Sequence, residues 1–166
     1  MNKELELKLV EKYPKILKEY GGDPRQTCMA FGIETESGWY DLLDKCMGKL
    51  QYFCGLCSKD GREVQVVANQ IKEKYSTLSF YTTIYGATDI ERDIIDDIIS
   101  EAERKSKYTC EITGKDGVMC KRGSWYKTLC YEEARKEGYI ACNPDTEKYW
   151  QSKDLKSNTP HNCWNM

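Results

Sequence analysis

The stretch LSFYTTIYGATDIERDIIDDIISEA, residues 78–102, sets a strand pattern directly before a helix pattern. Its first part, Leu78 to Tyr85, is rich in β-branched and aromatic residues that alternate between two faces, one of which carries Tyr81 and Tyr85. The next part, Thr88-Asp89-Ile90-Glu91, has the spacing of a capping box, and a wide stripe of isoleucines follows it at helical spacing. A strand beside a long amphipathic helix predicts an α+β fold.

The residues before this stretch favour helices. Apolar side chains recur at helical spacing over residues 3–20, where Pro14 is expected at the first turn of a second, short helix, and again over Gly38–Gln51. The stripe of Glu63–Tyr75 predicts a third helix. Between them, Cys54-Gly-Leu-Cys57 is read as a knuckle or as a loop between helices.

The residues after this stretch change character. Glycines and regularly spaced cysteines divide residues 107–142 into short pieces, with one short helix expected at Glu132–Glu137. We therefore expect three parts: a mainly helical body with a short strand or small sheet (1–106), a small β-rich satellite (107–142) and a polar C-terminal arm (143–166). The arm carries a few side chains able to anchor it, namely Trp150, His161, Cys163 and Trp164.

Charge and hydropathy exclude several classes of protein. The chain of 166 residues has a net charge of -2, which gives no general attraction for a polyanion. No run of 18 apolar residues occurs, and the N-terminus has charged residues where a signal peptide needs an apolar segment. We expect a cytoplasmic protein that neither spans a membrane nor is secreted.

Common catalytic patterns are missing from the sequence. It holds one histidine, His161, so a nucleophile pair has a single candidate base, and no P-loop, Gly-x-Ser-x-Gly or GxGxxG run accompanies it. Carboxylates at Asp93, Asp96, Asp97 and Glu101 fall opposite the isoleucine stripe, as on a solvated helix face. The sequence favours a protein that is not an enzyme, with an enzyme of unfamiliar site as the remaining alternative.

Nine cysteines raise the question of metal. Cys110 with Thr113, and Cys130 with Glu133, have the spacing of a two-knuckle zinc ribbon in which two of the four ligand positions lack cysteine or histidine. Because tetrahedral zinc needs four good ligands, we predict no cofactor, and zinc completed by Cys120 stays as the alternative. Two further candidates are read as unliganded: Cys54 with Cys57 as small apolar residues, and His161 with Cys163 as an unbound tail pair.

Two basic and aromatic patches are candidates for contact with a ligand. The first joins Lys72, Lys74 and Tyr81, and its alternative reading is a helix C-terminus stabilised by lysines. The second is the hairpin-like run 121–127, in which Arg122, Trp125 and Lys127 could clamp a phosphate and stack a ring. Its alternative reading has the tryptophan packed inward and the cations merely solvated.

Several stretches of the chain resemble a family of small uncharacterised proteins encoded by tailed bacteriophages. The resemblance covers roughly the first 140 residues in order, and its motifs stand at Tyr13-Pro14, Gly21 to Ala30, Gly38 to Leu43, Val66 to Tyr81, Cys110 to Gly114 and Trp125 to Cys130. In that family the satellite is usually a complete zinc ribbon, whereas this chain has Thr113 and Glu133 at the second and fourth ligand positions.

The resemblance implies a phage accessory protein that works in the host cytoplasm. We expect a non-catalytic binding protein, for example one that antagonises host defence by binding a host protein or sequestering a small nucleotide signal. The expected contact residues are Trp39, Tyr40, Lys72, Lys74, Tyr81, Arg122, Trp125 and Lys127. A nucleic-acid-binding module built on the ribbon-like satellite is the alternative, and the aromatic surplus also suits a homo-oligomer.

Overall fold

The structure, a computed structural model, describes residues 1–59 and 61–157. It has an α+β fold, as predicted. The helices are α1 (Lys3–Lys12), α2 (Tyr40–Cys57), α3 (Asp89–Ser106), α4 (Tyr131–Glu137) and α5 (Pro144–Ser157), with short 3-10 turns η1 (Cys28–Phe31) and η2 (Ser37–Trp39). The strands are β1 (Ile33–Glu34), β2 (Gln65–Lys74), β3 (Thr77–Tyr85), β4 (Val118–Arg122), β5 (Trp125–Leu129) and β6 (Ile140–Ala141).

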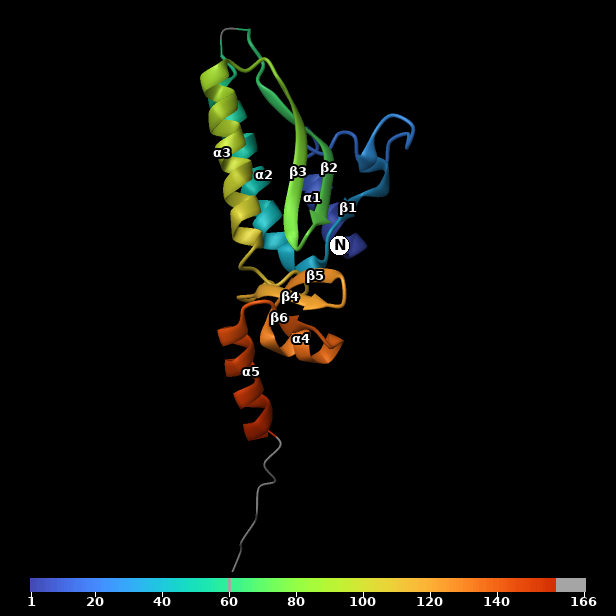
Figure 1. Ribbon diagram of the computed structural model, residues 1–166. Helices are drawn as coiled ribbons and strands as arrows, with labels where there is room; N and C mark the ends of the chain where they lie inside the picture. Colours follow the sequence, from blue (N-terminus) through green and yellow to red (C-terminus); the bar gives the residue numbers. More distant parts are fainter. Residues whose placement is uncertain (60, 158–166) are drawn as a thin grey trace, which may run out of the picture.

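The first sheet has the order β1-β2-β3 and is built around a long hairpin. Strands β2 and β3 are antiparallel, and the short β1 lies parallel to β2 on its other edge. Helices α2 and α3 lie side by side along one face of this hairpin (Figure 1). The opposite face of the sheet is left without a covering helix pair.

The second sheet is smaller and has the order β5-β4-β6. Helices α4 and α5 pack with it at the far end of the molecule (Figure 1). Arg135 of α4 holds α5 through ion pairs with Glu147 and Asp154, at 2.8 and 3.0 Å. The ring of Trp150 is buried against Tyr131, with 5.6 Å between ring centroids.

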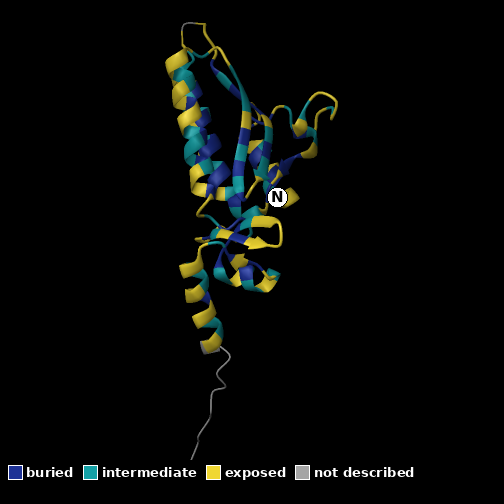
Figure 2. Ribbon diagram, viewed as in Figure 1, coloured by how far each residue is buried: buried dark blue, intermediate teal, exposed yellow. Residues whose placement is uncertain are grey.

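Buried apolar residues form two clusters, one for each sheet (Figure 2). The larger cluster fills the space between α1, α2, α3 and the first sheet, and it includes Trp39, Leu50 and Phe80. The smaller cluster includes Cys110, Leu129 and Trp150. The division into parts at residues 106 and 142 remains a prediction.

Hydrogen bonds to backbone carbonyls join the two clusters. The N–H of Gly38 donates to the carbonyl of Glu111 at 2.7 Å, and the indole N–H of Trp39 donates to the carbonyl of Thr109 at 2.8 Å. On the sheet side, the hydroxyl of Thr128 donates to the carbonyl of Ser76 at 2.7 Å. The satellite therefore docks on the body through hydrogen bonds to backbone carbonyls, which only a close approach can form.

The predicted third helix over Glu63–Tyr75 is wrong, because these residues form strand β2. A β-bulge between Ala68 and Gln70 inserts one residue into the strand. The residues facing the core are therefore Val66, Ala68 and Ile71. Because their spacing changes from two residues to three, they resemble the apolar stripe of a helix. The turn that follows uses Tyr75 and Ser76, both with positive φ, so no Asn-Gly or Asp-Gly signal marks the hairpin.

Three other boundaries differ from the predicted ones. Helix α1 ends before Pro14, and the expected short second helix is replaced by turns, since the carbonyl of Ile16 accepts the N–H of Ala68 in β2. Helix α2 runs beyond the predicted Gln51 to Cys57, so the knuckle or loop read at the Cys54 pair is wrong. The arm from 143 contains helix α5, for which Asn143-Pro144 is a start signal: the Asn143 side chain accepts the N–H groups of residues 145 and 146.

The helix after Thr88 is confirmed with its capping box complete, since the Thr88 and Glu91 side chains each accept the other's backbone N–H. We expect Thr88→Ala to lower the free energy of unfolding by about 1 kcal/mol, because it leaves a first-turn N–H without its partner. Ser100→Ala, inside the same helix, is the control and should change little. Urea denaturation measures both, and equal stability of the two variants would contradict the role of the cap.

Candidate functional site

One of the two predicted patches lies on the uncovered face of the first sheet. The register pairs Gln70 with Tyr81 and Lys72 with Ser79, and residues paired across two strands point to the same side. Lys72, Lys74 and Tyr81 therefore share this face. The helix-C-terminus reading of the patch is wrong, because the lysines lie on strand β2.

Three lysines stand over three tyrosines at this face and its ends. The ammonium nitrogen of Lys72 lies 5.7 Å from the ring centroid of Tyr81, and that of Lys74 lies 5.8 Å from the ring of Tyr75 at the turn. At the other end of the hairpin, Lys18 lies 5.3 Å from the ring of Tyr85. Tyr75, Tyr81 and Tyr85 are all exposed, so each pair offers an open ring beside a positive charge.

A hollow of about 460 Å³ lies beside Tyr85 on the same face. Gln65, Val67 and Tyr85 of the hairpin line it, and the turn segment after α1 closes one side with Pro14, Lys15 and Lys18. Glu63 also lines it and pairs with Lys15 at 3.2 Å, which leaves Lys18 as the cation directed at the ring. The hollow combines an aromatic wall, an apolar floor at Val67 and a cation at its rim.

The satellite patch is also at the surface. Gly123 and Ser124 connect β4 and β5, which confirms the expected hairpin, and Trp125 is 72% exposed, so the inward-packed reading is wrong. Arg122 is used within the satellite: its guanidinium lies 4.7 Å from the ring centroid of Tyr139 and donates to the carbonyl of Glu137. Lys127 lies close enough to the buried Glu111 for its positive charge to oppose the rise in the pKa of that carboxyl.

Two predicted contact residues lie elsewhere. Trp39 is fully buried in the larger cluster, where its indole N–H donates to the Thr109 carbonyl. Its side chain is therefore not accessible to a ligand. Tyr40 is half-buried and packs against the same cluster at the start of α2. Neither lies on the sheet face.

Two of the ribbon-like cysteines, Cys110 and Cys130, lie close together beside Thr113. The Thr113 hydroxyl lies 3.7 Å from the sulfur of Cys130. Burial raises the pKa of Cys110, but hydrogen bonds from the Thr113 hydroxyl and from backbone groups outweigh this and hold the pKa below its usual value. Cys120 donates to the carbonyl of Val118 at 3.3 Å, and burial raises its pKa to about 12.

The sequence offers two other cysteine-containing pairs as candidate metal ligands. Cys54 belongs to the larger cluster, and Cys57 lies in the same last turn of α2. The pair His161 and Cys163 lies outside the residues that the structure describes, as does Trp164. In the described part of the chain, no group of three or more histidine, cysteine or acidic side chains is placed to hold a metal ion.

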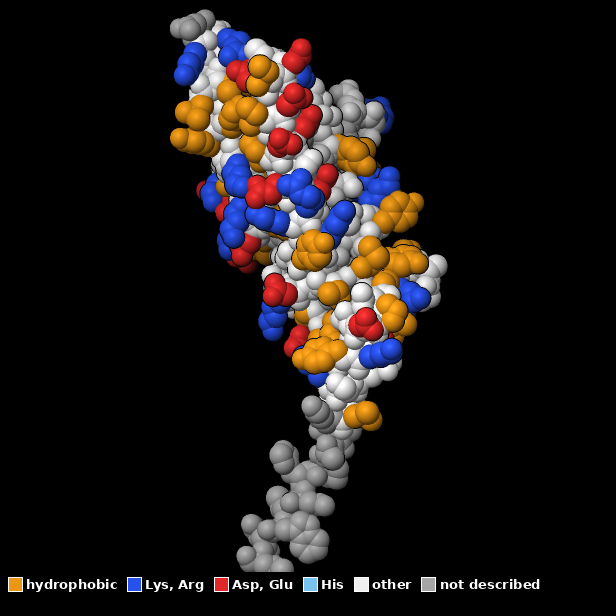
Figure 3. All heavy atoms as spheres, turned by 60° about the vertical axis from the view of Figure 1, so that its left-hand side comes forward, with side chains coloured by type: hydrophobic (Ala, Val, Ile, Leu, Met, Phe, Trp, Pro, Cys, Tyr) orange, Lys and Arg blue, Asp and Glu red, His pale blue; other side chains and the backbone are white. Residues whose placement is uncertain are grey.

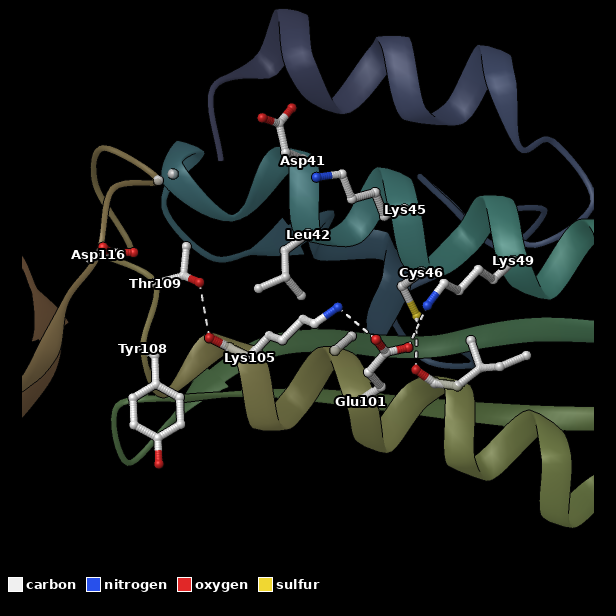
Figure 4. A pocket seen from close by; sticks show the side chains of 14 residues that line it. Asp41, Leu42, Lys45, Cys46, Lys49, Glu101, Lys105, Tyr108, Thr109 and Asp116 are labelled. Carbon is white, nitrogen blue, oxygen red and sulfur yellow. Dashed lines mark hydrogen bonds and ion pairs between the residues drawn. The ribbon is translucent and has the colours of Figure 1, made fainter.

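A second hollow, of about 420 Å³, lies between α2 and α3 near the satellite (Figure 4). Its floor is apolar, with Leu42 and Cys46 of α2 among the lining residues. Lys49 and Lys105 both reach Glu101, at 2.5 and 2.6 Å, which lowers the pKa of that carboxyl to about 2. Burial raises the pKa of Cys46 to about 12, so its thiol is no nucleophile at neutral pH.

Comparison with known proteins adds no assignment. No protein-family model, curated protein or solved structure matches this chain. The likeness to tailed-phage proteins therefore stays a prediction from the sequence. Along residues 1–59 and 61–157, no helix has the length and apolar character needed to cross a membrane.

Sequence reasoning missed three residues of the sheet face, namely Lys18, Tyr75 and Tyr85. The alternation of β3 already grouped Tyr85 with Tyr81, so the tyrosine could have been found from its period of two. Lys18 comes from a distant turn and carries no signal of its own. We call the set Lys18, Lys72, Lys74, Tyr75, Tyr81 and Tyr85 the tyrosine face.

Proposed function

We propose that this chain is a non-catalytic binding protein whose tyrosine face takes a small anionic ligand with a planar ring, of the nucleotide class. The observation that carries the proposal is the repetition of one unit, an exposed tyrosine with a lysine 5.3 to 5.8 Å from its ring, three times along one sheet. A base stacks on a tyrosine ring, and a neighbouring ammonium pairs with a phosphate.

The hollow beside Tyr85 suits a ligand of this size. Its volume of about 460 Å³ lies within the range of small-molecule sites. In it, the Tyr85 ring would stack on the base, Val67 would supply the apolar floor, and Lys18 would pair with the phosphate. Lys72 and Tyr81 continue the same arrangement for a ligand with a second nucleotide unit.

The biological setting comes from the phage resemblance. Under it, the protein acts in the host cytoplasm as an accessory protein that antagonises defence, either by sequestering a small nucleotide signal or by binding a host protein. The tyrosine face favours the first of these two roles.

We expect isothermal titration calorimetry against nucleoside phosphates and cyclic dinucleotides to detect at least one ligand. Tyr85→Ala should weaken its binding about tenfold or more, because stacking on one aromatic ring contributes about 1–3 kcal/mol. Lys18→Ala should weaken it less and should reduce its dependence on salt.

Tyr149→Ala is the matched control. Tyr149 is an exposed tyrosine on α5 with Lys153 4.9 Å from its ring, so it has the same unit on another part of the molecule. The Tyr149→Ala variant should bind the ligand as tightly as the unaltered protein does. Failure of every nucleotide to bind at millimolar concentration, or equal effects of the Tyr85 and Tyr149 variants, would remove the proposal.

A nucleic-acid-binding function is the second candidate, and the exposed Trp125 favours it. This residue stands on the β4–β5 hairpin, and β5 contacts the turn that bears Tyr75 through Thr128 and Ser76. Binding of single-stranded DNA or RNA that weakens steeply with salt and with Trp125→Ala would support this candidate over a small nucleotide. The net charge of -2 speaks against it.

A further inference from the structure

The interior of the satellite holds chemistry that the proposed nucleotide site does not use. On the side shown in Figure 3, hydrophobic and charged side chains are interspersed over the satellite, in the lower half of the view. Beneath this mixed surface, the thiols of Cys110, Cys120 and Cys130 lie in one buried cluster of the described residues. All of them are free thiols. Where two such sulfurs lie close enough, oxidation joins them as a disulfide.

The backbone brings Cys110 and Cys130 together. The N–H of Glu111 donates to the carbonyl of Thr128 at 2.9 Å, so the segments that carry the two cysteines are hydrogen-bonded neighbours. Gly117 lies between these segments. A Cβ on Gly117 would be 3.0 Å from the Cα of Cys110 and 3.2 Å from the carbonyl carbon of the residue before Cys130. Because glycine leaves this space without a side chain, the two cysteines approach closely.

The two sulfurs also meet each other directly. The thiols of Cys110 and Cys130 interact with each other, and the Thr113 hydroxyl contacts both sulfurs, at 3.7 Å from that of Cys130. Backbone N–H groups of residues 112, 113 and 130 are directed at the sulfur of Cys110. These donors stabilise the thiolate of Cys110, which is the form of a thiol that attacks another sulfur.

Cys120 is the other buried thiol of this cluster, and its contacts are of a different kind. It donates to the carbonyl of Val118 at 3.3 Å and lies 4.0 Å from the carbonyl of Leu129. Its hydrogen bonds therefore go to backbone, whereas Thr113 joins the side chains of Cys110 and Cys130. This difference makes Cys130 the partner of Cys110.

We infer that Cys110 and Cys130 are an oxidation site, at which a peroxide converts the two thiols into a reversible disulfide. Cys130 keeps a small exposed part, 5% of its surface, whereas Cys110 is fully buried. The peroxide therefore reacts first at Cys130. Cys110 lies behind it as the second, resolving thiol.

The reaction balances with one peroxide for each disulfide. Attack of the Cys130 sulfur on hydrogen peroxide forms an S–O bond and breaks the O–O bond, and the hydroxide that leaves takes up the thiol proton as water. The Cys110 sulfur then attacks the sulfur of this sulfenic acid. The S–S bond forms, the S–O bond breaks, and the second hydroxide leaves as water with the proton of Cys110. The two sulfurs lose two electrons, which reduce the peroxide.

The position of the disulfide gives it a structural effect. Cys110 precedes Glu111, whose carbonyl accepts the N–H of Gly38 from the body, and Cys130 directly precedes α4. The disulfide therefore ties α4 to the segment that docks on the body. Because a cross-link restricts mainly the unfolded chain, the oxidised protein should resist denaturant better than the reduced protein. Disulfides in the cytoplasm are usually transient and redox-sensing, so a reversible bond suits the expected location.

Peptide mapping by mass spectrometry tests this inference on the full chain, reduced, kept in chelator and treated with hydrogen peroxide. We expect a peptide pair joined through Cys110 and Cys130, about 2 Da lighter than the two thiol peptides together, and dithiothreitol should separate it. The exposed Cys28 calibrates the dose of peroxide. If Cys28 is completely oxidised while Cys110 and Cys130 stay thiols, or if Cys110 is found joined mainly to Cys120, the inference is wrong.

Two serine variants separate the pair from its surroundings. Cys130→Ser should abolish the cross-link, whereas Cys120→Ser, the matched control, removes a buried thiol of the same cluster and should keep it. Peroxide should raise the guanidinium concentration at which the unaltered protein and Cys120→Ser unfold, and should not do so for Cys130→Ser. A rise that persists in Cys130→Ser would contradict the pairing. The map of the unaltered protein decides the matter even where a variant fails to fold.

Discussion

Gly38→Ala is expected to destabilise the protein by about 3 kcal/mol or more, because no space exists for a methyl group at this position. A Cβ at Gly38 would lie 2.5 Å from the carbonyl oxygen of Glu111 and 2.6 Å from the nitrogen of Gly114, and closer still to the carbonyl of Cys110. All three atoms belong to backbone, which cannot rotate away. Satellite and body would have to move apart.

Gly55→Ala provides the matched control for this substitution. Gly55 lies inside α2, and a Cβ there would meet nothing within 4 Å. Alanine should stabilise the helix by up to about 1 kcal/mol relative to glycine. Guanidinium denaturation of both variants measures the difference, and a Gly38→Ala protein within 1 kcal/mol of the unaltered one would mean that body and satellite do not approach so closely.

Glu111→Gln is expected to remove a pH-dependent loss of stability. Burial raises the pKa of Glu111 from 4.5 to about 7. The backbone N–H of Glu36 and the charge of Lys127 oppose this shift, whereas the charge of Glu73 adds to it. One carboxyl oxygen of Glu111 and the hydroxyl of Ser76 are buried at this junction without a hydrogen-bond partner among the described residues.

The direction in which pH changes the free energy of unfolding follows from proton binding to Glu111. Between about pH 4.5 and 7 the folded protein keeps the proton of Glu111 while the unfolded chain loses it, so the free energy of unfolding falls as pH rises. The fall amounts to about 3 kcal/mol, at 1.36 kcal/mol per pKa unit, and is complete above pH 7. Below pH 4.5 both states are protonated and this contribution is fully present.

Comparison with Glu111→Gln isolates this contribution from other carboxyl groups. The variant and the unaltered protein should be similarly stable near pH 4, and the variant should be more stable at pH 8 by up to about 3 kcal/mol. Glu11→Gln, on the exposed side of α1, should follow the unaltered protein at both pH values. A difference that does not change with pH would show that the pKa of Glu111 is the same in the folded and the unfolded protein.

Local patterns in the sequence were sufficient for several elements. The capping box at Thr88 and the isoleucine stripe behind it predicted α3, because cap and stripe depend on residues within a few turns of each other. The alternation of Leu78 to Tyr85 predicted β3 and grouped Tyr81 with Tyr85. The glycine at 123 predicted the β4–β5 hairpin.

Other elements depended on partners far away in the chain. The core positions of β2 imitate a helix because of the bulge near Asn69, and the antiparallel pairing with β3 makes this segment a strand. Lys18 reaches Tyr85 only because the turn segment after α1 lies against β2 through Ile16 and Ala68. Trp39, an attractive contact residue in the sequence, is buried because the satellite closes over η2.

The sequence by itself determined the α+β class, the capped helix and the strand that carries Tyr81 and Tyr85, because each of these follows from spacings of two to four residues. The tertiary structure alone decided which side of the hairpin stays open, how the second hollow forms between α2 and α3, and how Gly38 and Glu111 meet. These features arise from contacts between residues tens of positions apart, and the burial they cause has no counterpart in a local pattern.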